Sequence, residues 1–157
     1  MEKGKWKVLV NGMGNIGTTL VNLLVEYRDV LEIEQIFVAK RSILPWNEVE
    51  RTFLEERGVV VCSYNPIGDM PLFETVMHEV DYIFEATANG VGLEKLPQYD
   101  QLKNLKGSSA QGSEKGYGIP FMSGVNDELL IHEKFVNVVS CNTHGSAAIL
   151  QLSLIHI

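Results

Sequence analysis

The sequence is poor in cysteine and proline and has no long apolar run. Its 157 residues include two cysteines, too few for the disulfide framework of a small secreted domain. No apolar run approaches the roughly 20 residues that span a bilayer. The basic start MEKGKWKVLV also lacks an apolar stretch of signal-peptide length. These absences favour a cytoplasmic protein with reduced thiols that does not enter a membrane.

Basic residues are the minority among the charged ones. The chain carries 13 lysines and arginines against 20 acidic residues, which gives a formal net charge of −7. This balance argues against nucleic acid or an anionic membrane surface as the main partner, although a few local donors can still bind a small anion. The length suffices for one domain with its own core, and the hydrophobic fraction of 45% is ordinary for a globular domain.

Strand-like and helix-like segments alternate along the first half of the chain. The predicted segments, in order, are strand 6–12, helix 15–29, strand 33–39, helix 46–58, strand 59–63, helix 69–80 and strand 81–87. This order predicts an α/β fold, a Rossmann-like, doubly wound and mostly parallel sheet with helices on both faces. A further strand is expected at 134–140, and a helix at 93–104 that breaks or kinks at Pro97. Segment 105–118 has too many small polar residues to predict a strand.

The segment NGMGNIG places Gly12, Gly14 and Gly17 in the spacing G-x-G-x-x-G. The motif follows a predicted strand and opens a predicted helix, which is the context of a dinucleotide-binding loop. The first glycine can make the tight turn, the second lets a pyrophosphate approach the backbone, and the third allows close helix–strand packing. The alternative is a glycine-rich turn that binds nothing.

The end of the second predicted strand, VAKRS, indicates which dinucleotide fits. NAD sites usually place an acidic residue there to bind the ribose 2′-hydroxyl. Here Lys40, Arg41 and Ser42 occupy that place, while Glu32 and Glu34 lie at the other end of the strand. Two cations and a hydroxyl suit a 2′-phosphate, so NADP is predicted to be accepted in addition to or in preference to NAD. The alternative is a solvated basic turn.

Cys141 follows the apolar strand FVNVVS and precedes small residues that can begin a helix. Because ligands gather at the carboxyl ends of parallel strands, we expect its thiol on the same sheet edge as the glycine loop. The start of a helix stabilises a thiolate, which makes Cys141 a candidate nucleophile. The alternative is a buried inert thiol, and this is the interpretation given to Cys62 inside VVVCS.

Five segments together carry a family resemblance: NGMGNIG, VAKRS, EATANGVG, QGSEKGYGIPF and VVSCNTHG. In this order the chain resembles the archaeal-type (type II) phosphorylating glyceraldehyde-3-phosphate dehydrogenases over residues 5–149. The resemblance implies NAD(P)-dependent oxidation of glyceraldehyde 3-phosphate to 1,3-bisphosphoglycerate. The substrates are then a phosphorylated aldehyde and inorganic phosphate, and the intermediate is a thioester on Cys141.

The resemblance also assigns roles to residues around these motifs. Ser140 and Asn142 flank the nucleophile as substrate contacts, and Asn142 is a candidate donor to a developing oxyanion. No metal is implied. The family's base histidine comes from much later in the chain, so His144 is predicted to be non-catalytic. The cofactor contacts that the family implies are Gly12, Met13, Gly14, Asn15, Ile16, Gly17, Lys40, Arg41, Ser42, Thr87, Gly90 and Gly112.

The last six residues, LSLIHI, do not resemble the family. They match the translation of a transposon-end sequencing adapter, so we expect 152–157 to be foreign sequence; an ordinary apolar terminal strand is the alternative. The expected organisation is a dinucleotide-binding domain at 1–140 and the start of a truncated catalytic domain at 141–151, with the second domain missing. The full-length form is expected to be a homo-oligomer, a tetramer by resemblance, and the fragment alone to be inactive.

Two other functions stay open on the sequence. One is a related semialdehyde or acyl-phosphate reductase, which shares the glycine loop and the cysteine thioester. The other is a non-catalytic NADP-binding module, against which the position of Cys141 at a strand end argues. A purely structural domain leaves both the glycine loop and Cys141 unexplained.

Overall fold

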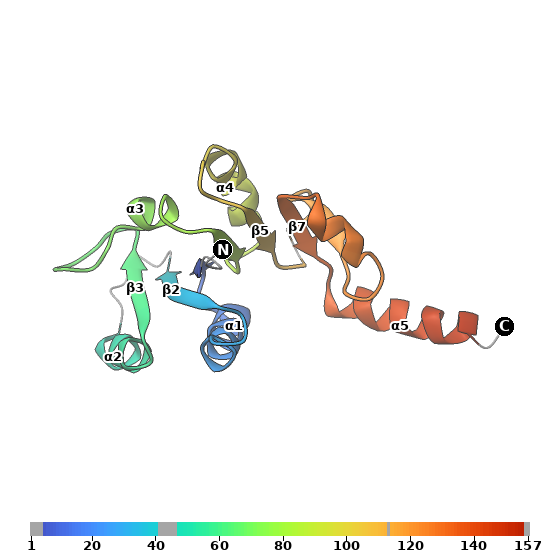
Figure 1. Ribbon diagram of the computed structural model, residues 1–157, viewed down its shortest axis with the longest axis horizontal. Coiled ribbons are helices and arrows are strands. Elements are labelled where there is room, and N and C mark those ends of the chain that lie inside the picture. The colour runs from blue at the N-terminus through green and yellow to red at the C-terminus, as the bar shows by residue number, and fades with distance from the viewer. Residues whose placement is uncertain (1–4, 41–46, 113, 156–157) are drawn as a thin grey trace.

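A computed structural model describes residues 5–40, 47–112 and 114–155. Seven strands form one parallel sheet in the order β3-β2-β1-β4-β5-β7-β6 (Figure 1). The strands are β1 (Trp6–Asn11), β2 (Ile33–Lys40), β3 (Val59–Ser63), β4 (Tyr82–Glu85), β5 (Gly107–Ala110), β6 (Ile119–Phe121) and β7 (Phe135–Val138). The predicted Rossmann-like fold is therefore confirmed, and the strand order reverses between β1 and β4.

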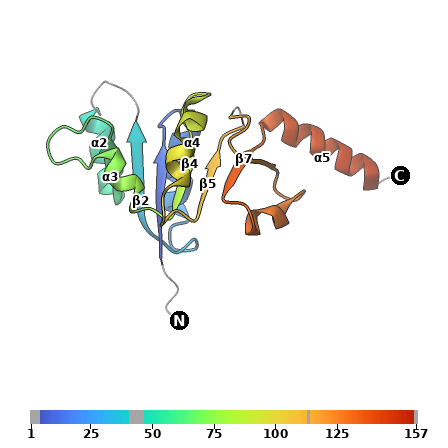
Figure 2. The same cartoon turned by 90° about the horizontal axis from the view of Figure 1, so that it is seen from above.

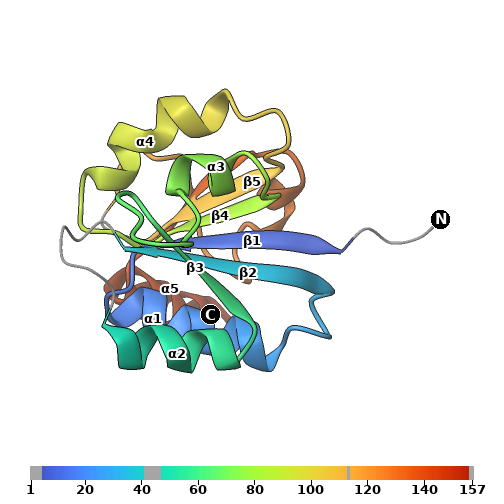
Figure 3. The same ribbon diagram turned by 90° about the vertical axis from the view of Figure 1, so that its left-hand side faces the viewer.

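Helices cover both faces of the sheet. They are α1 (Asn15–Glu26), α2 (Glu48–Glu56), α3 (Phe73–Met77), α4 (Val91–Asp100) and α5 (Cys141–Ile155), with a 3₁₀ helix at Asp127–Ile131. Figure 3 shows α1 and α2 on one side of the strands and α3 and α4 on the other. Side chains alternate along β1, so Val8 and Val10 join the core under α1 and α2, while Leu9 joins the opposite core.

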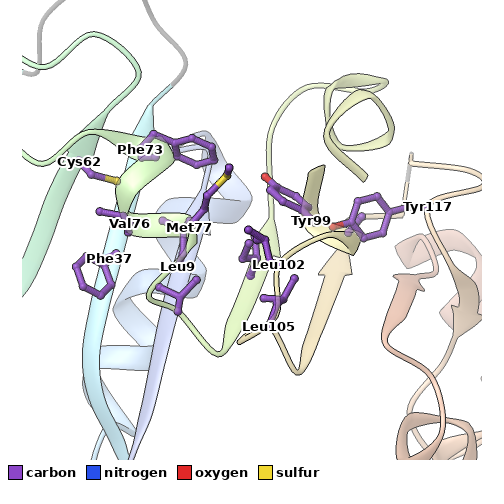
Figure 4. Close-up of a cluster of buried hydrophobic side chains, with 14 residues drawn as sticks. Leu9, Phe37, Cys62, Phe73, Val76, Met77, Tyr99, Leu102, Leu105 and Tyr117 are labelled. Atoms are coloured by element: carbon purple, nitrogen blue, oxygen red, sulfur yellow. The ribbon is translucent and has the colours of Figure 1, made fainter. Parts of the chain in front are cut away.

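The core beneath α3 and α4 is aromatic. Figure 4 shows Phe73, Tyr99 and Tyr117 pointing into it together with Leu9 from β1. Phe73 stacks on Tyr64 with ring centroids 4.1 Å apart. Because the hydroxyls of the buried tyrosines need partners, this core also holds the polar network described below.

The structure corrects the prediction for segment 105–118. Four of its residues form β5, and all four are buried between β4 and β7. Ser108 is accommodated because its hydroxyl donates to the Ile83 carbonyl at 2.7 Å and lies 2.6 Å from the Tyr117 hydroxyl. A Cβ on Gly107 would lie 2.8 Å from the Tyr82 ring, so close packing favours glycine at this position.

Other boundaries also differ from the sequence prediction. The helix expected at 69–80 shortens to α3, and α4 continues through Pro97 instead of breaking there. Strand β6 and the 3₁₀ helix were not predicted. The helix α5 projects away from the sheet beyond β7 (Figure 2), and Ile149, Leu150, Leu152 and Leu154 on it are 60–72% exposed. No helix within the described ranges is long and apolar enough to cross a bilayer.

A buried carboxylate, that of Glu85, joins the carboxyl ends of β1 and β4. Its Oε2 accepts hydrogen bonds from Asn11 Nδ2 and from the Tyr99 hydroxyl, both at 2.8 Å. Its Oε1 accepts from the Thr87 amide at 3.2 Å and the Thr87 hydroxyl at 2.5 Å. Burial raises the pKa of the Tyr99 hydroxyl, which therefore stays protonated as a donor. One fully hydrogen-bonded side chain thus fixes two strand ends.

We predict that Tyr99→Phe lowers the free energy of unfolding by about 1–3 kcal/mol, because it removes a buried donor to the Glu85 carboxylate. Urea unfolding followed by circular dichroism measures the change. Tyr27→Phe is the matched control, since the Tyr27 side chain is 48% exposed. Equal unfolding midpoints for the two variants would contradict the importance of this hydrogen bond.

Candidate functional site

The glycine loop passes between the ends of β1 and β4. Gly12 has a φ of +105°, and a Cβ there would lie 2.6 Å from the Ala86 carbonyl group and 2.7 Å from the Thr87 amide nitrogen. A Cβ on Gly17 would lie 1.8 Å from the Gly12 carbonyl oxygen. These two glycines are therefore required by the packing of the loop against β4 and α1.

Gly14 is different because a Cβ there would meet nothing within 4 Å. It caps α1 without any side-chain hydrogen bond to the first turn, and that turn contains no acidic residue. The loop and the helix start line an open cleft of about 660 Å³. Free amides at a helix N-terminus beside open space are suited to a pyrophosphate. This cleft fits a dinucleotide.

The segment after β4 forms the opposite wall of this cleft. Thr87 and Val91 line it, and Gly90 caps α4 with a φ of +89°. The Thr87 hydroxyl donates a hydrogen bond to the Glu85 carboxylate. The Thr87 carbonyl accepts a hydrogen bond from Gln111 Nε2 at 2.8 Å. Sequence analysis did not single out Gln111. The sequence indicates this residue only through its place in the segment QGSEKGYGIPF, because its contact with Thr87 depends on the tertiary structure.

A second cleft of about 600 Å³ adjoins the first. Ile16, Ala86 and Gln111 line both clefts. The second cleft continues to Ser140 and Cys141 after the end of β7. The structure therefore places the glycine loop and the cysteine on the same edge of the sheet, in neighbouring clefts with a shared wall.

Cys141 is the first residue of α5 and is exposed. The Ser140 hydroxyl accepts from the Thr143 amide at 3.4 Å, and the Ser140 carbonyl accepts from the His144 amide at 3.0 Å. The His144 ring nitrogen Nδ1 lies 3.3 Å from that same carbonyl. The Cys141 sulfur lies 4.0 Å from Asn142 Oδ1. These contacts hold His144 against the main chain of the helix start.

Gly112 supports the position of the cysteine. A Cβ there would lie 2.6 Å from the Ser140 amide nitrogen, so the loop after β5 packs directly on the residue before Cys141. The buried side chain of Asn137 holds the same loop, because its Nδ2 donates to the Gln111 carbonyl at 3.0 Å and to the Glu114 carbonyl at 2.9 Å. Gly112 lines the second cleft, whereas the predicted pyrophosphate contacts line the first.

Lys40, at the end of β2, lines the first cleft as well. Its ammonium forms an ion pair with the carboxylate of Glu50 on α2, a residue that the sequence prediction did not consider. Arg41 and Ser42, the other predicted contacts to a 2′-phosphate, lie outside the described residues. The predicted cation at the end of β2 therefore lies beside an acid of α2.

The other thiol, that of Cys62, lies in the core. Cys62 is fully buried, its Sγ donates to the Val38 carbonyl at 3.2 Å, and burial raises its pKa to about 12. This thiol stays protonated and inaccessible at neutral pH. Among the described residues no group of histidine, cysteine and acidic side chains could hold a metal ion. Of the two thiols, Cys141 is the accessible one, and it lines the second cleft.

Comparisons with known proteins point to one family. No family model matches the chain. The glyceraldehyde-3-phosphate dehydrogenase of Pyrococcus abyssi is 32% identical over 154 residues, which cover 90% of this chain and 43% of the relative. The enzyme of the same name from Sulfurisphaera tokodaii is 30% identical over 157 residues, which cover 93% of this chain and 43% of the relative. The one from Metallosphaera sedula is 27% identical over 161 residues, which cover 88% of this chain and 42% of the relative.

The chain is related to the archaeal glyceraldehyde-3-phosphate dehydrogenases. The resemblance stated from the sequence motifs is therefore confirmed. The chain spans 42–43% of the length of these dehydrogenases, and the similarity covers their N-terminal part. The dehydrogenase relationship agrees with a dinucleotide cleft beside a cysteine.

We predict that iodoacetamide modifies one thiol of the native chain and two thiols in urea, since Cys141 is exposed and Cys62 is buried. Intact-mass spectrometry counts the adducts, and peptide mapping locates them. Cys141→Ser is expected to abolish native labelling, whereas Cys62→Ser leaves it unchanged. Labelling of Cys62 in the native chain would contradict the placement of the two thiols.

Proposed function

We propose that this chain binds NADP or NAD at the glycine loop and supplies the nucleophile of a phosphorylating glyceraldehyde-3-phosphate dehydrogenase. The observation that carries the proposal is the shared wall of the two clefts, formed by Ile16, Ala86 and Gln111. It joins a phosphate-binding helix start to the strand end that bears Cys141. The first cleft lies at the point where the strand order reverses, which is the usual ligand position in open α/β sheets.

In the proposed reaction the Cys141 thiolate adds to the aldehyde carbon of glyceraldehyde 3-phosphate and forms a hemithioacetal. When bound, the dinucleotide would accept the hydride that the hemithioacetal carbon loses; with loss of the hydroxyl proton, this leaves a thioester on Cys141. Inorganic phosphate then attacks the Cys141 thioester, releases 1,3-bisphosphoglycerate and regenerates the thiolate. The covalent route divides one difficult step into easier ones. We assign Ser140 and Asn142, beside the thiol, to the substrate.

The cofactor contacts follow the walls of the first cleft. The start of α1, with Met13, Gly14, Asn15 and Ile16, is assigned to the pyrophosphate. Thr87 and Gly90 are assigned to the part of the dinucleotide nearer Cys141, and Lys40 to the adenosine ribose. Gly112 supports this arrangement through its contact with Ser140. The archaeal relatives are named glyceraldehyde-3-phosphate dehydrogenases, and the whole enzyme is proposed to act on the same phosphorylated aldehyde. The whole enzyme is also proposed to be a homo-oligomer.

We predict that Gly14→Ala weakens NADPH binding at least about tenfold, because its methyl group enters the open space that the pyrophosphate needs. The unfolding midpoint is expected to stay unchanged, since the methyl group meets no protein atom within 4 Å. Titration of NADPH fluorescence and urea unfolding measure the two quantities.

Gly145→Ala on α5 is the matched control, because a Cβ there also meets nothing within 4 Å. This control variant is expected to bind NADPH as the unmodified chain does. If Gly14→Ala and Gly145→Ala bind NADPH equally well, the glycine loop is not the dinucleotide site.

A further inference from the structure

The ion pair between Lys40 and Glu50 lies at the place where dinucleotide sites distinguish NADP from NAD. Lys40 ends β2, and its side chain lines the cleft of the glycine loop. Glu50 lies in the first turn of α2, and its carboxylate contacts the Lys40 ammonium. The two side chains are 26% and 33% exposed, so solvent screens their interaction less than that of a fully exposed pair.

The other cation of α2 cannot take over from Lys40. Arg51 follows Glu50 directly, but its Nε donates to Glu55 Oε1 at 2.6 Å and its Nη2 to Asp69 Oδ1 at 3.3 Å. Among the residues that the structure describes along this cleft, Lys40 carries the positive charge. The cation that the structure describes for a 2′-phosphate in this cleft therefore already has a carboxylate partner.

A ribose at this position meets two opposite requirements. A 2′-phosphate is attracted by Lys40 and repelled by Glu50, whereas a 2′-hydroxyl can donate a hydrogen bond to a carboxylate. We propose that Glu50 is a specificity-determining residue that limits the affinity for NADP relative to NAD by holding Lys40. The inference rests on the proposed function, because it requires a dinucleotide in the cleft of the glycine loop.

The test is a titration of the full chain with NADPH and with NADH, followed by nucleotide fluorescence. Glu50→Gln is expected to tighten NADPH binding by roughly two- to fivefold, the range of a partly screened ion pair. NADH binding is expected to stay constant or to weaken. In a Lys40→Met background, Glu50→Gln is expected to give a smaller gain in NADPH affinity, since only the repulsion between Glu50 and the 2′-phosphate is then removed.

Glu56→Gln is the matched control, because it removes the same charge at the other end of α2. An equal gain in NADPH affinity for Glu56→Gln and Glu50→Gln would attribute the effect to net charge and overturn the inference. An unchanged ratio of NADPH to NADH affinity in Glu50→Gln would also overturn it, while binding of both nucleotides still supports the proposed function. If the unmodified chain binds neither nucleotide, the proposed function itself fails.

Discussion

The contact between the glycine loop and the end of β4 is the constraint on which the site depends. Gly12 lies so close to the Ala86–Thr87 peptide that any side chain would collide with it. That peptide is held in turn by Glu85, whose carboxylate accepts from the Thr87 amide and also from Asn11 at the end of β1. A buried carboxylate with four donors is costly to disturb, so the two strand ends keep a fixed separation.

This constraint leaves open the space that a dinucleotide needs. Because Gly12 and Gly17 are needed for packing, Gly14 and the first turn of α1 are left to line the open cleft. Gln111 connects this cleft to the next strand through its hydrogen bond to Thr87, and Gly112 lets the following residues pack on Ser140. The position of the thiol is therefore coupled to the cleft of the glycine loop through a chain of contacts across β4, β5 and β7.

The sequence predicted the elements whose signals are local. The glycine spacing, the helical periodicity of α1 and the apolar strands β2, β3 and β7 were all recognised correctly. Strand β5 was missed, because its small polar side chains are satisfied by tertiary hydrogen bonds such as that of Ser108. Gln111 and Glu50 were missed for the same reason, since each acquires its meaning from a partner on another element.

Above all, we propose that a dinucleotide bound at the glycine loop extends towards Cys141. A nitroxide label on Cys141 tests this most directly, since the buried Cys62 does not take up the reagent. The measurement is the paramagnetic broadening of the proton resonances of bound NADP, with the chemically reduced label as control. We expect stronger broadening of the nicotinamide protons than of the adenine protons. Stronger broadening of the adenine protons, or equal broadening of both rings, would contradict it.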